Sequence, residues 1–204
     1  MLQFIHRVLV LPLLLCVCTV TQGQSLKTKQ EKGYFNITTP AELQVMWSID
    51  SAMLNEGNAR FKAGFEMQTV NGYFVNPQFS IGLGVGLQFS HYKYYPSAAV
   101  SDDTLQFHGA RITSLPIFAD FRYYPRNSIN GTMFLVNAGY APSLQASNKD
   151  HKPFFNGGPF IKLGAAYKFY LSDLISLVPS LNFKAQRYGD HTVAGGTLGL
   201  GLMF

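Results

Sequence analysis

Charged residues are scarce in this chain. Only 13% of its 204 residues are Asp, Glu, Lys or Arg, whereas a typical soluble domain carries about 25%. Beyond the N-terminus, however, no run approaches the ~20 consecutive apolar residues that a membrane helix requires. The composition therefore argues against an ordinary soluble domain and excludes a helical membrane protein.

Cysteine is confined to the N-terminal stretch MLQFIHRVLVLPLLLCVCTVTQGQ, as Cys16 and Cys18. A basic lead, an apolar run and small residues near the end of this stretch are typical of a secretory signal peptide. We therefore predict that residues 1–23 are removed, which leaves the mature chain without a disulfide or a thiol. A lipoprotein would need its cysteine to follow small residues, but Leu15 and Val17 precede these two.

The formal net charge is +5, and a short predicted periplasmic leader, residues 24–32, carries Lys27, Lys29 and Lys32. Solvation of this leader explains the positive excess, and attraction to anionic lipid headgroups is the alternative. Export argues against nucleic acid as a partner. We expect outer-membrane lipid to surround the rest of the chain.

Glycine and aromatic residues are abundant, with 19 Gly, 17 Phe and 11 Tyr, a composition poor for helices and good for strands. Hydrophobicity alternates with period two, most clearly in FSIGLGVGLQFS from Phe79 to Ser90. Eight such runs lie at 35–50, 61–69, 79–90, 115–123 (beginning near Phe107), 134–140, 161–169, 177–186 and 197–204. We predict an all-β fold over residues 33–204, an eight-stranded antiparallel up-and-down transmembrane β-barrel.

The predicted connections alternate in character. They fall at 51–59, 93–106, 143–156 and 189–191 on one side, and near 71–76, 125–131 and 172–174 on the other. Because outer-membrane barrels have long external loops and short periplasmic turns, this alternation predicts that both termini are periplasmic. Only the last external loop is short.

Aromatic residues collect at the strand ends, as the interfacial belts of a membrane barrel require. The predicted periplasmic belt is Phe35, Phe79, Tyr123, Phe134, Phe169 and Phe204, and the outer belt is Trp47, Phe61, Phe89 and Tyr140. The alternative is a soluble β-sandwich or lipocalin-like barrel with its aromatics inside. Such a fold would be rich in charge on its other face, which here is rich in Gly, Ser, Gln and Asn.

The inner face carries charges of both signs. An eight-stranded barrel is filled by side chains, which argues against a porin, and buried charges must pair. We predict a structural ion-pair cluster, with a proton or ion pathway as the alternative, from Glu42, Lys62, Glu66, Asp120, Arg122, Lys162, Lys168 and Lys184. Within it, Glu66, Asp120, Arg122 and Lys168 are expected to meet in the periplasmic half. Inward glycines such as Gly82, Gly84, Gly86, Gly164, Gly199 and Gly201 would make room for larger neighbours.

No catalytic, cofactor or metal site is predicted. The candidate bases are His91, His108, His151 and His191, in or beside the outer loops. Ser90 and Asp190 are sequence neighbours of two of them, but adjacent strand residues point to opposite faces. The histidines lack metal-ligand spacing, and the GLGVG motif lies mid-strand rather than before a helix. We therefore expect neither an enzyme nor a metalloprotein.

The C-terminal LGLGLMF, ending at Phe204, resembles the strand that barrel assembly machinery recognises. KGYFNITT, NGYFVNPQFSIGLGVGLQF and TSLPIFADFRYYP resemble the small outer-membrane β-barrel family of Bacteroidetes that includes PorT-like proteins. The resemblance spans nearly all of the mature chain and implies fold and location, with a hint of protein secretion.

Two functions remain open. The barrel is either a scaffold that displays loops such as YKYYPSAAVSDDT and QASNKDHKPFFNG to an unidentified protein partner, or an accessory of outer-membrane transport or protein secretion. A plugged lumen would favour the scaffold, and a continuous water path would favour transport.

Overall fold

The computed structural model describes residues 33–48, 59–94, 108–126, 128–147, 157–172, 175–188 and 191–204. They form ten strands: β1 (Gly33–Ser48), β2 (Ala59–Asn76), β3 (Phe79–Tyr94), β4 (His108–Ser114), β5 (Ile117–Tyr123), β6 (Gly131–Ala141), β7 (Ser143–Ser147), β8 (Gly158–Tyr170), β9 (Ser176–Tyr188) and β10 (His191–Met203). The predicted signal peptide and leader lie outside the described residues. No helix in the described part of the chain is long and apolar enough to span a membrane.

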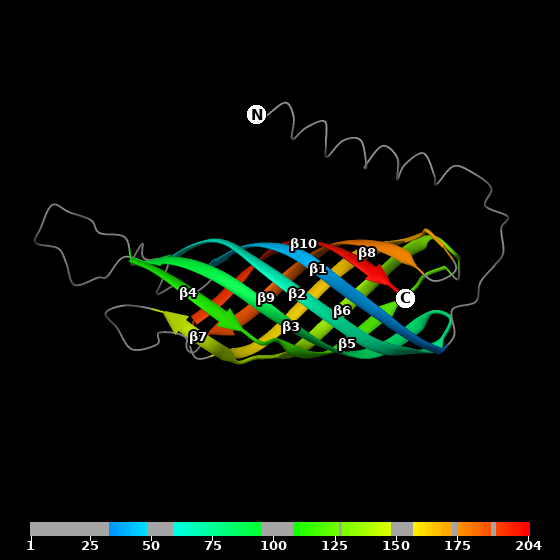
Figure 1. The fold of residues 1–204 in the computed structure, drawn as a ribbon, viewed down its shortest axis with the longest axis horizontal. Coiled ribbons are helices and arrows are strands. Elements are labelled where there is room, and N and C mark those ends of the chain that lie inside the picture. The colour runs from blue at the N-terminus through cyan, green and yellow to red at the C-terminus, as the bar shows by residue number, and fades with distance from the viewer. Residues whose placement is uncertain are drawn as a thin grey trace, which may run out of the picture.

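The strands close into a barrel (Figure 1). β4 and β5 are two halves of one barrel strand, interrupted at Leu115 and Pro116, and β6 and β7 are halves of another, interrupted at Pro142. The breaks are bridged by backbone bonds, from Leu115 N–H to the Pro142 carbonyl (2.9 Å) and from Gly86 N–H to the Pro116 carbonyl (2.8 Å). Counted in this way there are eight barrel strands. Each barrel strand pairs antiparallel with the next, and β1 pairs with β10. The predicted eight-stranded up-and-down barrel is confirmed.

One end of the barrel, here called the turn end, holds the connections β2–β3, β5–β6 and β8–β9 together with the C-terminus (Figure 1). The first of these turns is tight, because the Asn76 side-chain oxygen accepts the backbone N–H groups of Gln78 (2.8 Å) and Phe79 (2.9 Å). The opposite end, the loop end, carries the predicted external loops. These fall largely outside the described residues.

Two predicted connections begin too early. β2 continues to Asn76, so the turn predicted near 71–76 is wrong. The side chains of Val70 and Phe74 still point inward there, Gly72 between them is buried, and the period of two is not broken until the turn. At the loop end, β7 pairs with β4 over 143–147, which the sequence placed in a loop.

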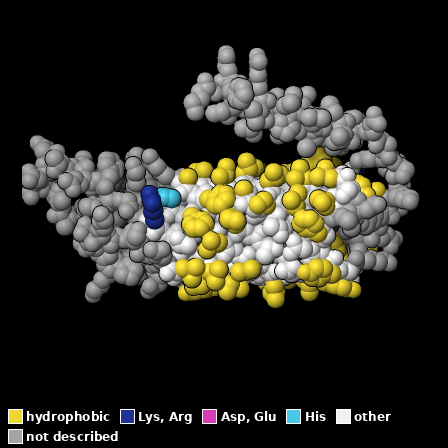
Figure 2. All heavy atoms as spheres, in the orientation of Figure 1, with side chains coloured by type: hydrophobic (Ala, Val, Ile, Leu, Met, Phe, Trp, Pro, Cys, Tyr) yellow, Lys and Arg dark blue, Asp and Glu magenta, His cyan; other side chains and the backbone are white. Residues whose placement is uncertain are grey.

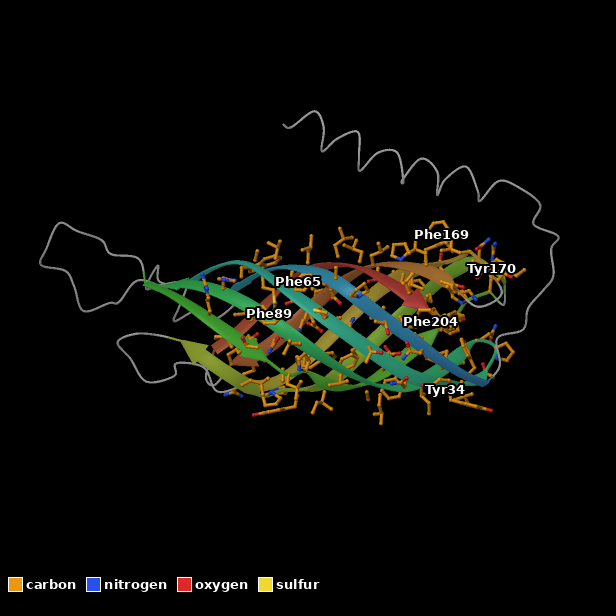
Figure 3. The ribbon with its side chains drawn as sticks, viewed as in Figure 1. Tyr34, Phe65, Phe89, Phe169, Tyr170 and Phe204 are labelled. Carbon is orange, nitrogen blue, oxygen red and sulfur yellow. The ribbon has the colours of Figure 1, made fainter. Side chains whose placement is uncertain are left out.

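The outer surface is apolar. Large hydrophobic side chains such as Leu83, Leu181 and Leu198 are more than half exposed, and they cover much of the surface in Figure 2. Aromatic side chains project near both ends: Phe65 and Phe89 nearer the loop end, and Tyr34, Phe169 and Phe204 nearer the turn end in Figure 3. This outside has the character that a lipid bilayer requires.

Eight of the ten aromatic residues predicted for the belts face outward. Phe79, Tyr123, Phe134, Phe169, Phe204, Trp47, Phe89 and Tyr140 all face outward and are exposed. The Phe61 side chain lies outside the described ones. The prediction that Phe35 belongs to the periplasmic belt is wrong, because its side chain is 1% exposed and points into the lumen.

A β-bulge at Pro40 explains why Phe35 points inward. The register of β1 shifts between Thr38 and Ala41 against β10, because Pro40 inserts one extra residue into the strand. Pro40 and Ala41 both face outward, so the alternation changes phase there. Phe35 and Ile37 therefore point inward, although they share odd numbers with the outward Val45.

The lumen near the turn end is filled by an apolar plug: Phe35, Ile37, Val70, Phe74, Tyr124, Met133, Leu135, Val178 and Met203. Phe118 and Phe160 extend the same buried cluster toward the loop end, with their ring centroids 5.8 Å apart. The Phe74 ring contacts Phe35 and Tyr124, with centroids 5.1 and 5.2 Å away. Glycines accommodate these rings. A Cβ atom on Gly84 would come within 2.2 Å of the Phe118 ring, and one on Gly72 within 2.4 Å of Phe35.

Candidate functional site

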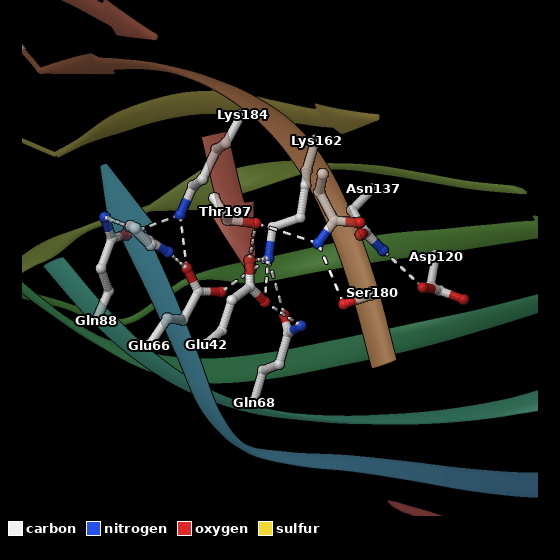
Figure 4. A network of polar contacts seen from close by, with 12 residues as sticks. Glu42, Glu66, Gln68, Gln88, Asp120, Asn137, Lys162, Ser180, Lys184 and Thr197 are labelled. Atoms are coloured by element: carbon white, nitrogen blue, oxygen red, sulfur yellow. Dashed lines mark hydrogen bonds and ion pairs between the residues drawn. The ribbon is translucent and has the colours of Figure 1, made fainter. Parts of the chain in front are cut away.

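Four buried charges occupy the middle of the lumen (Figure 4). Glu42 on β1 and Glu66 on β2 are directly paired residues in the sheet. Lys162 on β8 and Lys184 on β9 are likewise paired. Strand alternation brings all four inward, and each is 0% exposed. One wall of the lumen thus carries two adjacent carboxylates, and another carries two adjacent ammonium groups.

Like charges on directly paired residues destabilise a sheet, and here each is offset by its counterpart across the lumen. Lys162 Nζ lies 2.9 Å from the Glu42 carboxylate and 3.4 Å from Glu66 Oε1. Lys184 Nζ lies 2.7 Å from Glu66 Oε2. The two walls are electrostatically complementary only when the barrel is closed.

Neutral polar side chains complete this ionic network. Gln44 and Lys184 both donate to Glu66, at 2.5 and 2.7 Å, while Gln68 and Thr197 donate to Glu42 at 2.8 and 2.5 Å. Gln88 accepts from Lys184 at 3.0 Å and contacts Gln44, Ser90 and Tyr188. The network therefore joins β1, β2, β3, β8, β9 and β10. Its buried carboxylates accept, and its buried ammonium groups donate, the hydrogen bonds that burial demands.

A second charged pair lies on β5. Asp120 and Arg122 are neighbours on the inner face and form a bidentate contact, with N–O distances of 2.7 and 3.0 Å. Asn137 donates to Asp120 at 2.6 Å, and the Arg122 guanidinium also contacts the Met133 sulfur at 3.6 Å. This pair adjoins the apolar plug.

The structure groups the predicted charges differently from the sequence analysis. Asp120 and Arg122 meet, but Glu66 contacts Lys162 and Lys184 instead. The reason is that β2 continues to Asn76, so Glu66 lies farther from the turn end than predicted. Lys168 is buried on β8 at 2% exposure. The Lys62 side chain lies outside the described ones.

The glutamines of the network were not among the predicted site residues. Gln44, Gln68 and Gln88 occupy inward positions of the same alternation that selected the charges, so the pattern held a signal for them. Their partners depend on how the strands close, which the alternation of single strands does not specify.

A cavity of about 20 Å³ lies between the two charged groups, with room for about one water molecule. Its lining includes Arg122, Asn137, Lys162, Ser180 and Asn182. Buried side chains of the ionic network and of the apolar plug lie on either side of it.

Among the candidate histidines, the structure describes the side chain of His91, which is exposed on β3. The side chains of His108 and His191, like residues 151 and 190, lie outside the described ones. Within the described ranges, no group of three or more His, Cys, Asp or Glu side chains is placed to hold a metal ion.

Comparison with solved structures gives the same fold at low sequence identity. The outer membrane protein OprG from Pseudomonas aeruginosa matches with a TM-score of 0.55 and 11% identity, over 87% of this chain and 98% of that one. Neisserial surface protein A (TM-score 0.49, 14% identity, 84% and 98% covered) and the outer membrane protein AlkL in lipid bilayers (0.48, 13%, 90% and 94%) are also similar.

No family model matches the chain, and no curated protein sequence matches it significantly. The resemblance to PorT-like proteins therefore stays a prediction. What the comparisons add is the fold: a closed eight-stranded antiparallel barrel of the kind found in small outer-membrane proteins.

Proposed function

We propose that this protein is an outer-membrane barrel whose role is to anchor and display its loop-end segments, as a scaffold for a protein partner. The observation that carries the proposal is the filled lumen. The ionic network joins six strands across its middle, and the apolar plug fills the part towards the turn end. A solute would have to displace both, whereas a rigid anchor gains from both.

The location follows from the outer surface. Its exposed apolar side chains, such as Leu83 and Leu181, suit contact with the hydrocarbon core of a bilayer. The aromatic side chains near its two ends suit the two membrane–water interfaces. We place the turn end in the periplasm, because short turns face that side in such barrels. In this orientation the segments 95–106 and 148–156 face the outside, after removal of a signal peptide over 1–23 and with 24–32 as a periplasmic leader.

Two experiments test the scaffold. Purified protein in planar bilayers should show no steady porin-like conductance. Replacing 95–106 and 148–156 with short Gly-Ser turns should leave the barrel folded, as judged by heat-modifiable gel mobility, while a partner captured by the unaltered protein is lost. Steady conductance of the unaltered protein, or a partner retained by the shortened barrel, would contradict the scaffold.

The second candidate is an accessory role in outer-membrane transport or protein secretion. The resemblance of KGYFNITT and TSLPIFADFRYYP to PorT-like barrels favours it. Gentle detergent extraction from the native outer membrane, followed by mass analysis, separates the two roles. A stoichiometric secretion or transport subunit would assign the protein to that machinery, and a barrel recovered with a loop-dependent partner but without such a subunit would favour the scaffold.

A further inference from the structure

One part of the outer surface is polar although the outward residues beside it on the neighbouring strands are apolar. Asn36 and Thr38 on β1 and Thr69 and Asn71 on β2 all face outward and form the β1–β2 polar patch. The bulge at Pro40 turns the first two outward.

The patch begins at the level of Phe204, which exchanges backbone hydrogen bonds with Asn36, and it extends toward the loop end along β1 and β2. On β2, Thr69 is midway between the outward rings of Phe65 and Tyr73. The residues that flank it on the neighbouring strands are apolar: Leu83 is paired with Asn71, Val85 with Thr69, and Leu202 with Thr38. Exposure of polar side chains to hydrocarbon is costly, so this placement calls for a reason.

The patch meets most of its hydrogen-bonding needs internally. Asn36 Nδ2 donates to Thr69 Oγ1 (3.1 Å) and to Asn71 Oδ1 (2.8 Å), Thr38 donates to Asn36 Oδ1 (2.9 Å), and the two threonine hydroxyls are 3.0 Å apart. Tyr34 also donates to Asn71. Within the described residues, the exposed Asn71 amide nitrogen is left without an acceptor, and it faces the bilayer.

We propose that the β1–β2 polar patch is an intramembrane contact between two copies of this chain. The patch carries no charged side chain, so it does not match a lipid phosphate, and its donors do not match acyl chains. Every member has both a donor and an acceptor, which makes the surface complementary to itself, as a two-fold contact requires. Thr and Asn side chains hydrogen-bond neighbouring membrane-spanning helices to one another, and the patch presents the same donors and acceptors.

The rim of the patch supports the same occupant. Leu83, Tyr34, Leu43 and Tyr73 are 58–72% exposed around it. In a two-fold contact these side chains would pack around the polar centre and keep it away from lipid. The arrangement of a polar centre within an apolar rim thus suits a partner with the same surface.

Disulfide cross-linking in native membranes tests the contact. Both native cysteines precede the described barrel, so replacing them with Ala allows a single reporter. Leu83→Cys places it beside an intact patch, and Leu163→Cys on β8 is the matched apolar control, since that side chain is 45% exposed on another wall. Mild oxidation should convert Leu83→Cys to a dimer on a non-reducing gel and leave Leu163→Cys monomeric.

The patch itself is tested by Thr69→Val with Asn71→Leu in the Leu83→Cys background. We expect roughly tenfold less dimer from losing these polar contacts on both copies, with unchanged heat-modifiable mobility. Thr69→Val alone, a milder change, should reduce the dimer less. The proposal fails if Leu83→Cys stays monomeric, if both reporters cross-link equally, or if the dimer persists without the patch. A monomer that retains a lipid in native mass spectrometry, and loses it in the double variant, would assign the patch to lipid instead.

Discussion

Glu66 and Lys184 are 118 residues apart in the chain, and their side chains meet across the lumen with 2.7 Å between Oε2 and Nζ. Their strands, β2 and β9, are not neighbours, because β1 and β10 lie between them in the sheet. The contact therefore forms only when the first and last strands have paired. It links barrel closure directly to the pairing of buried charges.

Removal of one member of this network should destabilise the barrel strongly. Glu66→Ala leaves Lys184 and Lys162 with a single carboxylate between them, and we expect a loss of about 3–5 kcal/mol in the free energy of unfolding. Urea unfolding in detergent, followed by the fluorescence of the single Trp, Trp47, measures the loss. Exposed Met67→Ala on the same strand is the control and should change little.

The double variant Glu66→Met with Lys184→Met should recover much of this stability, because it removes both charges and keeps the volume. A double variant that is less stable than Glu66→Ala would show that the remaining amides and hydroxyls depend on the ion pair itself.

The second charged pair allows a separate test. Asp120→Ala leaves the buried Arg122 guanidinium without its carboxylate partner, so we expect lower stability by about 3–5 kcal/mol with membrane insertion intact. Fractionation and heat-modifiable mobility report insertion, and urea unfolding reports stability. Unchanged stability would mean that Arg122 finds another acceptor in the lumen.

Period-two alternation was sufficient to predict the eight strands and their outward faces. It failed at β1 for a physical reason. The odd positions are apolar on both sides of Pro40, but Leu43 and Val45 are apolar because they face outward, whereas Phe35 and Ile37 are apolar because they form the plug. Hydrophobicity by itself does not distinguish these two environments, and only the proline marks the change of face.

The composition of the site was more predictable than its contacts. Strand alternation identified Glu42, Lys162 and Lys184 as inward, yet which charges meet depends on the stagger between strands. That stagger was misjudged at β2, since the Asn71–Gly72 pair favours a turn in isolation but continues the strand in the barrel. The register between distant strands is set by closure, which no local pattern contains.

Replacing a glycine that faces the lumen with Ala should lower stability much more than the same replacement on the outer face. Gly84→Ala would bring a methyl group to within 2.2 Å of the Phe118 ring, while a Cβ atom on the outward Gly196 meets nothing within 4 Å. We expect Gly84→Ala to lower stability by about 1–3 kcal/mol and Gly196→Ala to be neutral, by urea unfolding. Phe118→Leu should partly rescue Gly84→Ala, and failure of this rescue would place the strain elsewhere.

The C-terminal residue should matter for assembly. Phe204 exchanges two backbone hydrogen bonds with Asn36, at 3.1 and 2.8 Å, at the end of the β1–β10 seam. Deletion of Phe204 should reduce the amount of heat-modifiable barrel in the outer membrane, whereas Phe134→Ala, which removes a similarly exposed ring, should reduce it less. Equal effects would show that Phe204 contributes only lipid-facing area.

Single-residue deletions in β1 can separate the bulge from the regular strand. Pro40 is the extra residue, so its deletion leaves Thr39 inward and Ala41 outward as they are now, and the barrel should still fold. Deletion of Val45, in the regular part, shifts one side of the strand by one residue and reverses its faces, which would expose Glu42 and Gln44 to lipid or bury Trp47. We expect heat-modifiable barrel for the Pro40 deletion and almost none for the Val45 deletion. If the Pro40 deletion also gives almost no heat-modifiable barrel, the bend of the bulge is itself required for barrel closure, in addition to the change of face that it produces.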